Sequence, residues 1–233
     1  MHPEIILTAD GSHTLYVPEL NEHYHSIHGA IQESRHVFIQ EGFYHCNKNS
    51  LNILEIGFGT GLNVLLTYFE SKKTGKRIYF QTIDNYPLKS SIIKELNYPE
   101  ILQTPTGGRI FRKLHNSPWG KKVNLSYTFT LFKIQADIKH HLITGMFDII
   151  YYDAFGPDKQ PEMWTPEIFK KIYKTMNTNA IFVTYTAKGK VRRTLQETGL
   201  DVSLVPGPPG KRHMLRGVKI KGKRKYRISN TEQ

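Results

Sequence analysis

The chain has 233 residues, 39% of them hydrophobic, which is enough for one large α/β domain with a small appendage. No apolar stretch approaches the ~18 residues of a membrane span, so we expect no membrane insertion. Cys46 is the single cysteine, which excludes an internal disulfide. Since no leader-like segment opens the chain either, we expect a cytoplasmic protein. Lys and Arg number 32 against 20 Asp and Glu, and this net charge of +12 favours a polyanionic partner over an uncommitted basic surface.

The first 45 residues predict a small cap. Residues 4–17 have the pattern of a β-hairpin, because two apolar segments flank a turn at Asp10-Gly11. A helical pattern begins at about Gly29, and the segment shows none of the strand–helix alternation that follows it. We therefore divide the chain into a hairpin and helix cap (1–45), a main domain (46–221) and a basic tail (222–233).

A glycine-rich loop follows the first strand of the main domain. Residues 51–56 read as a strand buried on both faces, and the loop GFGTG (57–61) leads directly into an apolar helical pattern, with Thr60 predicted to cap the helix. Glycines at this point allow a sharp reversal and a close approach of the backbone to a ligand. The acidic Glu55 in this strand and Asp84 at the end of the next favour a nucleoside ligand over a purely structural turn.

Strands and helices then alternate to the end of the chain. Further strands are predicted at 77–84, 127–134, 147–153, 180–186, 200–205 and 213–221. Helices are predicted at 89–96, 138–143, 166–176 and 189–199, with a loop rich in Pro, Thr and Gly before Trp119. This order predicts an α/β fold with a doubly wound, mostly parallel seven-stranded sheet and a ligand at the carboxyl ends of its strands.

Acidic residues follow several of these strands. Asp84 lies 23 residues after Gly61, a separation that suits a carboxylate binding both hydroxyls of a ribose. Asp137 is predicted either to contact an adenine amino group or to cap helix 138–143. Asp153 ends the fourth strand of the main domain, where a buried carboxylate needs a functional or ionic partner, so we expect it to face the reacting group.

The spacing G-x-G-x-G departs from the G-x-G-x-x-G of NAD-binding dehydrogenases and, with acidic strand ends, resembles that of class I S-adenosylmethionine-dependent methyltransferases. Further segments narrow the resemblance: ESRHVFI, EIGFGTGLN, TIDNYPL, DIIYYDAFGPDKQPEMWTPEIF, TYTAKGKVRRTLQETG and GKRHML. Over roughly residues 30 to 218 the chain resembles the methyltransferase domain of the tRNA 5-methylaminomethyl-2-thiouridine biosynthesis enzymes.

This resemblance implies a Rossmann-like fold and the transfer of a methyl group from S-adenosyl-L-methionine to the amine of 5-aminomethyl-2-thiouridine at the tRNA wobble position. Asp153 and Phe155 match the family's catalytic D-G-F loop, with Ala154 in place of the glycine. The residues matched to cofactor binding are Gly57, Phe58, Gly59, Gly61, Asp84 and Asp137, beside Glu55. The family's flavin-dependent domain would lie beyond Gln233, so FAD is not expected, nor is an obligate protein partner.

Basic residues cluster toward the end of the chain, and we expect some of them to bind the phosphates of a tRNA anticodon stem-loop. The candidates are Lys188, Lys190, Arg192, Arg193, Lys211 and Arg212. The alternative is that they are solvated surface residues.

Two other functions remain open at this point. A polyamine aminopropyltransferase would share the fold and an amine acceptor, although the basic composition argues against an acidic groove for a polyamine. A non-catalytic tRNA-binding protein on the same scaffold is the second. No metal site is predicted, because His23, His25 and His28 lack cysteine or carboxylate partners at ligand spacing.

Overall fold

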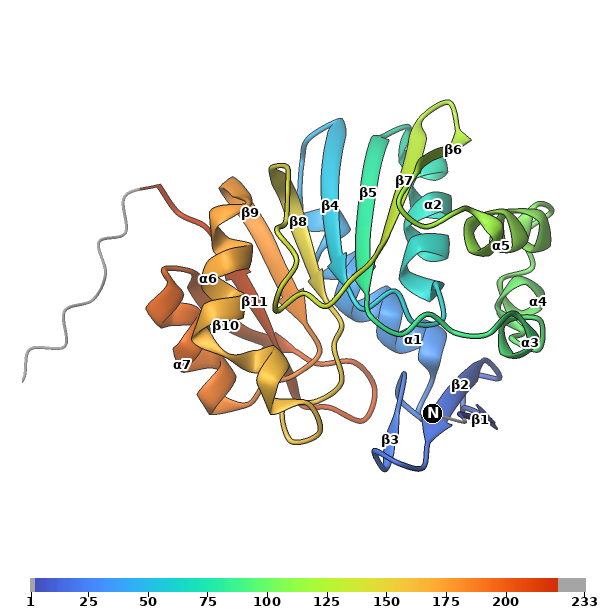
Figure 1. Ribbon diagram of the computed structural model, residues 1–233, viewed down its shortest axis with the longest axis horizontal. Coiled ribbons are helices and arrows are strands. Elements are labelled where there is room, and N and C mark those ends of the chain that lie inside the picture. The colour runs from blue at the N-terminus through green and yellow to red at the C-terminus, as the bar shows by residue number, and fades with distance from the viewer. Residues whose placement is uncertain (1–2, 222–233) are drawn as a thin grey trace, which may run out of the picture.

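The computed structural model describes residues 3–221, and its centre is an eight-stranded sheet (Figure 1). The strand order is β10-β11-β9-β8-β4-β5-β7-β6. Their bounds are β4 (Ser50–Ile56), β5 (Arg77–Asp84), β6 (Lys122–Ser126), β7 (Phe129–Gln135), β8 (Phe147–Tyr152), β9 (Met176–Thr184), β10 (Asp201–Pro206) and β11 (His213–Val218). The five strands from β9 to β7 pair in parallel, while β6, β10 and β11 pair antiparallel, so the predicted mostly parallel sheet is confirmed.

The sheet has one strand more than the seven expected. A strand was predicted at 127–134, but Tyr127 and Thr128 form a turn between β6 and β7. β6 is a short edge strand with the sequence KVNLS, and only Leu125 of its side chains is fully buried. Edge strands of this kind lack the long apolar pattern by which a buried strand is predicted.

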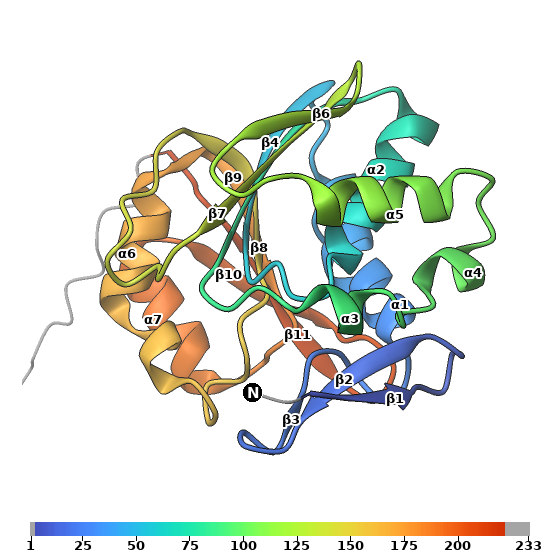
Figure 2. The same ribbon diagram turned by 45° about the vertical axis from the view of Figure 1, so that its right-hand side comes forward.

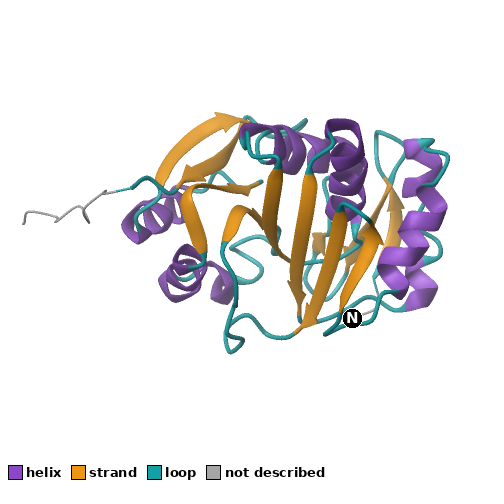
Figure 3. Cartoon of the chain, turned by 90° about the horizontal axis from the view of Figure 1, so that it is seen from above, coloured by secondary structure: helices purple, strands orange, loops and turns teal. Residues whose placement is uncertain are grey.

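Helices cover both faces of the sheet, as Figures 2 and 3 show. One face carries α2 (Leu62–Thr74) and α5 (Gly107–Asn116), and the other carries α6 (Pro166–Lys174) and α7 (Gly189–Thr198). Successive side chains of a strand point to opposite faces. Tyr151 is accordingly buried in the first core and Tyr152 in the second, and both are fully inaccessible to solvent. The predicted doubly wound architecture follows from these two cores.

The segment between β5 and β6 is more helical than predicted. Of the predicted helix 89–96, the structure shows α3 (Ser90–Ile93), and the expected loop contains α4 (Tyr98–Leu102) and α5. Helix α5 begins with Gly107-Gly108, which disfavour helices in isolation. Its buried side chains, Ile110, Phe111 and Leu114, lie on one face and pack beside α2, so tertiary packing stabilises a helix that local preference does not indicate.

The predicted helix 138–143 is wrong, because this segment forms a turn and an extended stretch. The ammonium group of Lys171, on α6, donates hydrogen bonds to the carbonyls of Ile138, Lys139 and His141 at 2.7, 2.8 and 3.2 Å. A distant side chain therefore satisfies the carbonyls that would otherwise accept hydrogen bonds within a helix.

The N-terminal segment forms a second, three-stranded sheet beside the carboxyl ends of the central strands (Figure 1). It contains the predicted hairpin, β1 (Glu4–Leu7) and β2 (His13–Val17), together with β3 (Glu22–His23). The helical part is α1 (Ala30–Ser34), a π-helix (Arg35–Gln40) and a 3₁₀ turn (Phe43–His45). This part packs into the first core of the main sheet, where Phe38 lies 5.1 Å from Tyr151 between ring centroids.

No helix within residues 3–221 combines the length and apolarity needed to cross a membrane. The predicted basic tail, 222–233, lies outside the described residues.

Candidate active site

A cavity of about 350 Å³ opens at the carboxyl ends of β4, β5, β7 and β8, within the size range of small-molecule sites. Three groups of residues form most of its wall: the glycine loop after β4, the segments that follow β5, β7 and β8, and residues 22–27 of the N-terminal segment. Glu33, Tyr185 and Lys211 also line it. Most sequence-predicted cofactor and catalytic residues lie here. They are Gly57, Phe58, Gly59, Asp84, Asp137, Asp153 and Phe155.

The glycine loop needs its glycines. Gly57, Gly59 and Gly61 have φ angles of +94°, +48° and +73°, in the region that L side chains rarely adopt. A Cβ on Gly57 would lie 2.5 Å from the carbonyl oxygen of Asp153, and one on Gly61 would lie 2.9 Å from the His115 ring. Gly61 does not line the cavity; it begins helix α2 instead.

Thr60 does not cap α2 as predicted, because Gly61 takes the N-cap position and no side chain bonds there. The Thr60 hydroxyl pairs with Nε2 of His25 at 2.9 Å instead. Burial lowers the pKa of His25 to about 4, so the ring is neutral near pH 7. The contact therefore ties the N-terminal sheet to the glycine loop.

Asp84 ends β5 with its carboxylate at the glycine loop. It accepts hydrogen bonds from the backbone N–H groups of Gly59 and Tyr86, at 2.9 and 2.8 Å. Burial raises its pKa above the usual value, and these amides oppose the rise. An acid that is held by backbone amides at the cavity wall can present its remaining lone pairs to vicinal hydroxyls, as expected of a ribose-binding carboxylate.

Asp137 lines the cavity after β7 but caps no helix, since the predicted helix is absent. Its carboxylate accepts a hydrogen bond from the backbone N–H of Lys139 at 2.9 Å and lies 3.3 Å from the Lys139 ammonium. Burial raises the pKa of Asp137, but the hydrogen bonds and charge of Lys139 together outweigh this and hold it below the usual value. Of the two roles expected from sequence, the cavity position favours contact with a ligand.

Asp153 follows β8 directly, and its surroundings shift its pKa strongly. Burial raises its pKa to about 7, while a hydrogen bond of 2.8 Å from the side-chain amide of Asn63 opposes the rise. Glu33 raises the pKa further and Lys211 lowers it. The carboxylate is therefore close to half-protonated at neutral pH and can accept a proton from a ligand.

The loop after Asp153 is held on both sides. The carbonyl of Ala154 accepts a hydrogen bond from the Tyr185 hydroxyl at 2.9 Å, and that of Phe155 accepts one from the Trp164 indole at 2.8 Å. Positive φ angles among the described non-glycine residues occur at Asn21, Gln103 and Asn179. Ala154 therefore has an ordinary backbone conformation, and its replacement of the family glycine causes no strain.

Glu55, which was expected at the cofactor, lies behind the cavity wall. It is fully buried and is not part of the cavity wall. Burial raises its pKa well above the usual value, and the Asp153 and Asp84 charges add to the rise. Its carboxyl oxygens have no hydrogen-bond partner within residues 3–221. A protonated Glu55 can support the two acids in front of it without adding a third charge.

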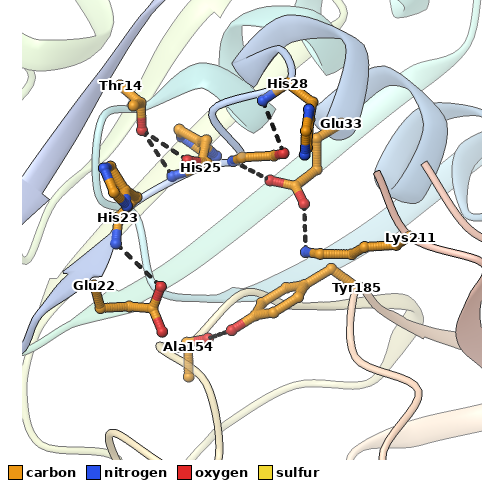
Figure 4. Close-up of polar contacts among 10 residues, drawn as sticks. Thr14, Glu22, His23, His25, His28, Glu33, Ala154, Tyr185 and Lys211 are labelled. Atoms are coloured by element: carbon orange, nitrogen blue, oxygen red, sulfur yellow. Dashed lines mark hydrogen bonds and ion pairs between the residues drawn. The ribbon is translucent and has the colours of Figure 1, made fainter. Parts of the chain in front are cut away.

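The N-terminal sheet supplies cavity residues that sequence reasoning missed. Tyr24 packs edge-on against Phe155, with ring centroids 4.9 Å apart, and lies against Gly59. Glu33, at 6% exposure, accepts a hydrogen bond from the backbone N–H of Ser26 at 2.7 Å. Figure 4 shows the carboxylate of Glu33 facing the ammonium of Lys211. No motif marked these residues, because the sequence cannot show that this sheet closes over the cavity.

The predicted RNA-binding residues fall into three groups. Lys211 lines the cavity, where its ammonium pairs with Glu33 at 2.6 Å while its side chain stays 35% exposed. Lys188 lies at the start of α7 and forms an ion pair with Asp158. The other candidates stand on α7 or the β10–β11 loop: Lys190, Arg193 and Arg212 are exposed, while Arg192 is half-buried with its Nε unpartnered among the described residues.

The charge inside the cavity is opposite to that of the whole chain. Six carboxyl groups line it, against the two lysines Lys139 and Lys211. The carboxyl groups belong to Glu22, Glu33, Asp84, Asp137, Asp153 and Glu162. The expectation that a basic chain lacks an acidic groove is therefore wrong for this site. An acidic cavity suits a cationic sulfonium and an alkylammonium.

These residues fit the methyl donor S-adenosyl-L-methionine. Gly57 and Gly59 line the cavity, Asp84 offers acceptors for ribose hydroxyls, and Asp137 and Ile138 line the same cavity after β7. Within residues 3–221, no cluster of three or more His, Cys, Asp or Glu side chains is arranged to hold a metal ion.

Comparisons with known proteins agree with this geometry. A family model described as S-adenosyl-L-methionine-dependent methyltransferase matches residues 113–220. The tRNA 5-methylaminomethyl-2-thiouridine biosynthesis bifunctional protein MnmC of Burkholderia thailandensis is 31% identical over 230 residues, which cover 91% of this chain and 34% of that protein. The chain thus spans about a third of the length of the curated relatives it matches.

Solved structures give the same result. The crystal structure of MnmC2 from Aquifex aeolicus matches with a TM-score of 0.75 and 26% identity, covering 93% of this chain and 70% of that one. Spermidine synthase from Thermotoga maritima shares the fold, with a TM-score of 0.53 and 12% identity over 97% of this chain and 74% of that one. By these comparisons the chain is similar to S-adenosyl-L-methionine-dependent methyltransferases and, among them, to the tRNA 5-methylaminomethyl-2-thiouridine biosynthesis proteins.

Proposed function

We propose that this protein transfers a methyl group from S-adenosyl-L-methionine to the amine of 5-aminomethyl-2-thiouridine at the wobble position of cytoplasmic tRNA. The observation that carries the proposal is the placement of Asp153, whose carboxyl group shares one acidic cavity with the glycine loop and Asp84. The names of the relatives supply the substrate class. The exposed Lys190, Arg193 and Arg212 support a polyanionic partner outside the cavity.

Asp153 is the proton acceptor in this proposal. A lysine-like amine has a pKa of about 10, so an acceptor amine arrives mostly as the ammonium, which has no lone pair. The pKa of Asp153 is raised to about 7. It therefore lies closer to the pKa of the amine than that of an ordinary aspartate does, and proton transfer from the ammonium is less unfavourable. The bound cofactor supplies an electrophilic methyl group on a sulfonium. The nitrogen would lose a proton to Asp153, and its lone pair would then be free to take up the methyl group that the bound donor would supply.

Neighbouring residues orient the reacting groups. Asn63 holds one oxygen of Asp153 through its 2.8 Å hydrogen bond, so the other oxygen remains for the amine. Phe155 and Tyr24 form an aromatic wall that can stack on a pyrimidine base and exclude water. A fixed attack geometry of this kind accounts for several kcal/mol of a reaction barrier, which makes orientation the larger part of the catalysis.

The direct test uses tRNA that carries 5-aminomethyl-2-thiouridine. We expect incubation with the protein and S-adenosyl-L-methionine to add one methyl group to that nucleoside, as measured by mass spectrometry of the nuclease digest. The Asp153→Asn variant should lose the activity while its cofactor affinity stays within about threefold, or about 0.65 kcal/mol. Unmodified nucleoside with the wild-type protein, despite tRNA binding, would favour a non-catalytic RNA-binding protein.

The acidic cavity also favours a second candidate, an aminopropyltransferase that acts on a polyamine. Its donor would be decarboxylated S-adenosylmethionine. A thermal-shift comparison of the two donors separates the functions, since the proposed methyltransferase should be stabilised more by the donor with its carboxylate. Stronger stabilisation by the decarboxylated donor would favour the second candidate.

A further inference from the structure

Lys211, Glu33 and Tyr185 form a compact cluster in the cavity wall. The Lys211 ammonium lies 2.6 Å from Oε1 of Glu33 and 4.2 Å from the centroid of the Tyr185 ring (Figure 4). The three residues come from the β10–β11 loop, α1 and the segment after β9. Tyr185 is anchored by its hydrogen bond to the carbonyl of Ala154, next to Asp153.

This arrangement has the chemistry of an ammonium-binding site. A buried carboxylate and the face of an aromatic ring are the groups that proteins use to hold alkylammonium ions. The Glu33 side chain is 8% exposed, and its second oxygen is already bonded to the Ser26 amide, so the carboxylate is fixed in place. The ammonium that fills the site belongs to the protein itself.

The carboxyl groups of the cavity wall would also attract free ammonium ions that are not the substrate. With six carboxyl groups around it, the cavity attracts any small cation, including free diamines and polyamines. An enzyme whose acceptor amine is attached to a tRNA needs to keep these free amines away from its acceptor position. To reject a competing ligand, a binding site needs a group that disfavours that ligand, in addition to contacts with the correct substrate.

We propose that Lys211 is a specificity-determining residue that occupies an ammonium site and thereby excludes free alkylammonium ions from the acceptor region. The proposal rests on the proposed function for its biological meaning, but its central claim concerns ligand binding and is tested without tRNA. Removing the Lys211 side chain leaves Glu33 and Tyr185 facing an open space beside Asp153. An exogenous diammonium ion can enter that space.

The probe is putrescine, titrated calorimetrically into the wild-type protein and into Lys211→Ala. We expect at least about tenfold tighter binding to the variant, equivalent to about 1.4 kcal/mol. The gain should disappear in the double variant Glu33→Gln, Lys211→Ala, because the carboxylate of the site is then neutral. Lys211→Arg keeps the charge and should bind putrescine no better than the wild type does.

Lys139→Ala is the matched control. It also removes a lysine from the cavity wall, one that pairs with Asp137 at 3.3 Å, but Lys139 stacks on no described aromatic ring. We expect a gain in putrescine affinity below about threefold, or about 0.65 kcal/mol. Equal gains in the two variants would show that only the total cavity charge matters, which overturns the proposal. Unchanged affinity in a folded Lys211→Ala protein overturns it as well.

A second variant covers the case in which Lys211→Ala does not fold. Lys211→Gln keeps a hydrogen-bond donor for Glu33 but loses the charge, so it should also bind putrescine more tightly than the wild type. In the methyl-transfer assay, putrescine should inhibit these variants at concentrations that leave the wild type unaffected. An inactive wild-type protein would refute the proposed function, whereas the binding comparison would still decide the role of Lys211.

Discussion

Replacing Asp153 with Asn is expected to stabilise the protein while it abolishes methyl transfer. Burial raises the pKa of this carboxyl group from 3.8 to about 7. Each pKa unit corresponds to about 1.36 kcal/mol, so the ionised group lowers the free energy of unfolding by at most about 4 kcal/mol. Because the side chain borders the cavity, we expect Asp153→Asn to raise the free energy of unfolding at pH 8 by about 2–4 kcal/mol.

The sign of the pH dependence follows from the direction of the pKa change. Below about pH 4 the carboxyl group is protonated in both folded and unfolded protein, so wild type and variant differ least there. Between about pH 4 and pH 7 the unfolded chain ionises first, and the wild type loses stability relative to the variant as the pH rises. Above about pH 7 both states of the wild type are ionised, and the difference stays constant.

Urea denaturation of the cofactor-free proteins at pH 5, 6, 7 and 8 measures this difference. Asp158→Asn is the matched control, because Asp158 lies on the same loop with a side chain that is 73% exposed. Its effect should stay within about 0.5 kcal/mol at every pH. Parallel stability curves for wild type and Asp153→Asn across this range would refute the inference that Asp153 is a buried acid with a raised pKa.

Three further predictions concern the loop, a buried lysine and the surface. Gly57→Ala should lower the free energy of unfolding by about 2–3 kcal/mol, because the new Cβ would lie 2.5 Å from the carbonyl oxygen of Asp153. It should also weaken cofactor binding in calorimetry. A melting temperature equal to that of the wild type would contradict this prediction. Burial lowers the pKa of Lys133 to about 8. The free energy of unfolding of the wild type should therefore rise as the pH increases from 8 toward 10. Denaturation curves of Lys133→Met should show no such rise. Arg193→Ala and Arg212→Ala should each reduce the log–log salt slope of tRNA binding by about 0.7–0.9, and an unchanged slope would remove the residue from the interface.

The sequence predicted those parts of the fold that depend on local patterns. The apolar run before Gly57 and the glycines after it identify β4, the loop and α2, since a strand buried on both faces and a reversal at positive φ need these residue types. Asp84 and Asp153 were placed correctly for a related reason. Parallel strands gather their carboxyl ends at one edge, so an acid after each strand reaches the same cavity.

The elements that sequence reasoning missed depend on distant contacts. Helix α5 begins with two glycines and is stabilised by packing beside α2, while the predicted helix 138–143 is replaced by a turn that Lys171 holds from α6. The ion pair between Lys211 and Glu33 was missed for the same reason. Its neighbours in sequence are basic, but its neighbour in space is the buried carboxylate of Glu33. Periodicity and spacing carry no information about such partners.

The contact between the Gly57 backbone and the Asp153 carbonyl has an evolutionary consequence. The glycine loop and the loop that begins at Asp153 touch at Gly57 without an intervening side chain, so neither can be altered in isolation. Substitutions in the two loops should therefore show strong epistasis, with double variants departing from the sum of the single effects. Laboratory evolution toward a new acceptor would then advance by paired changes across both loops.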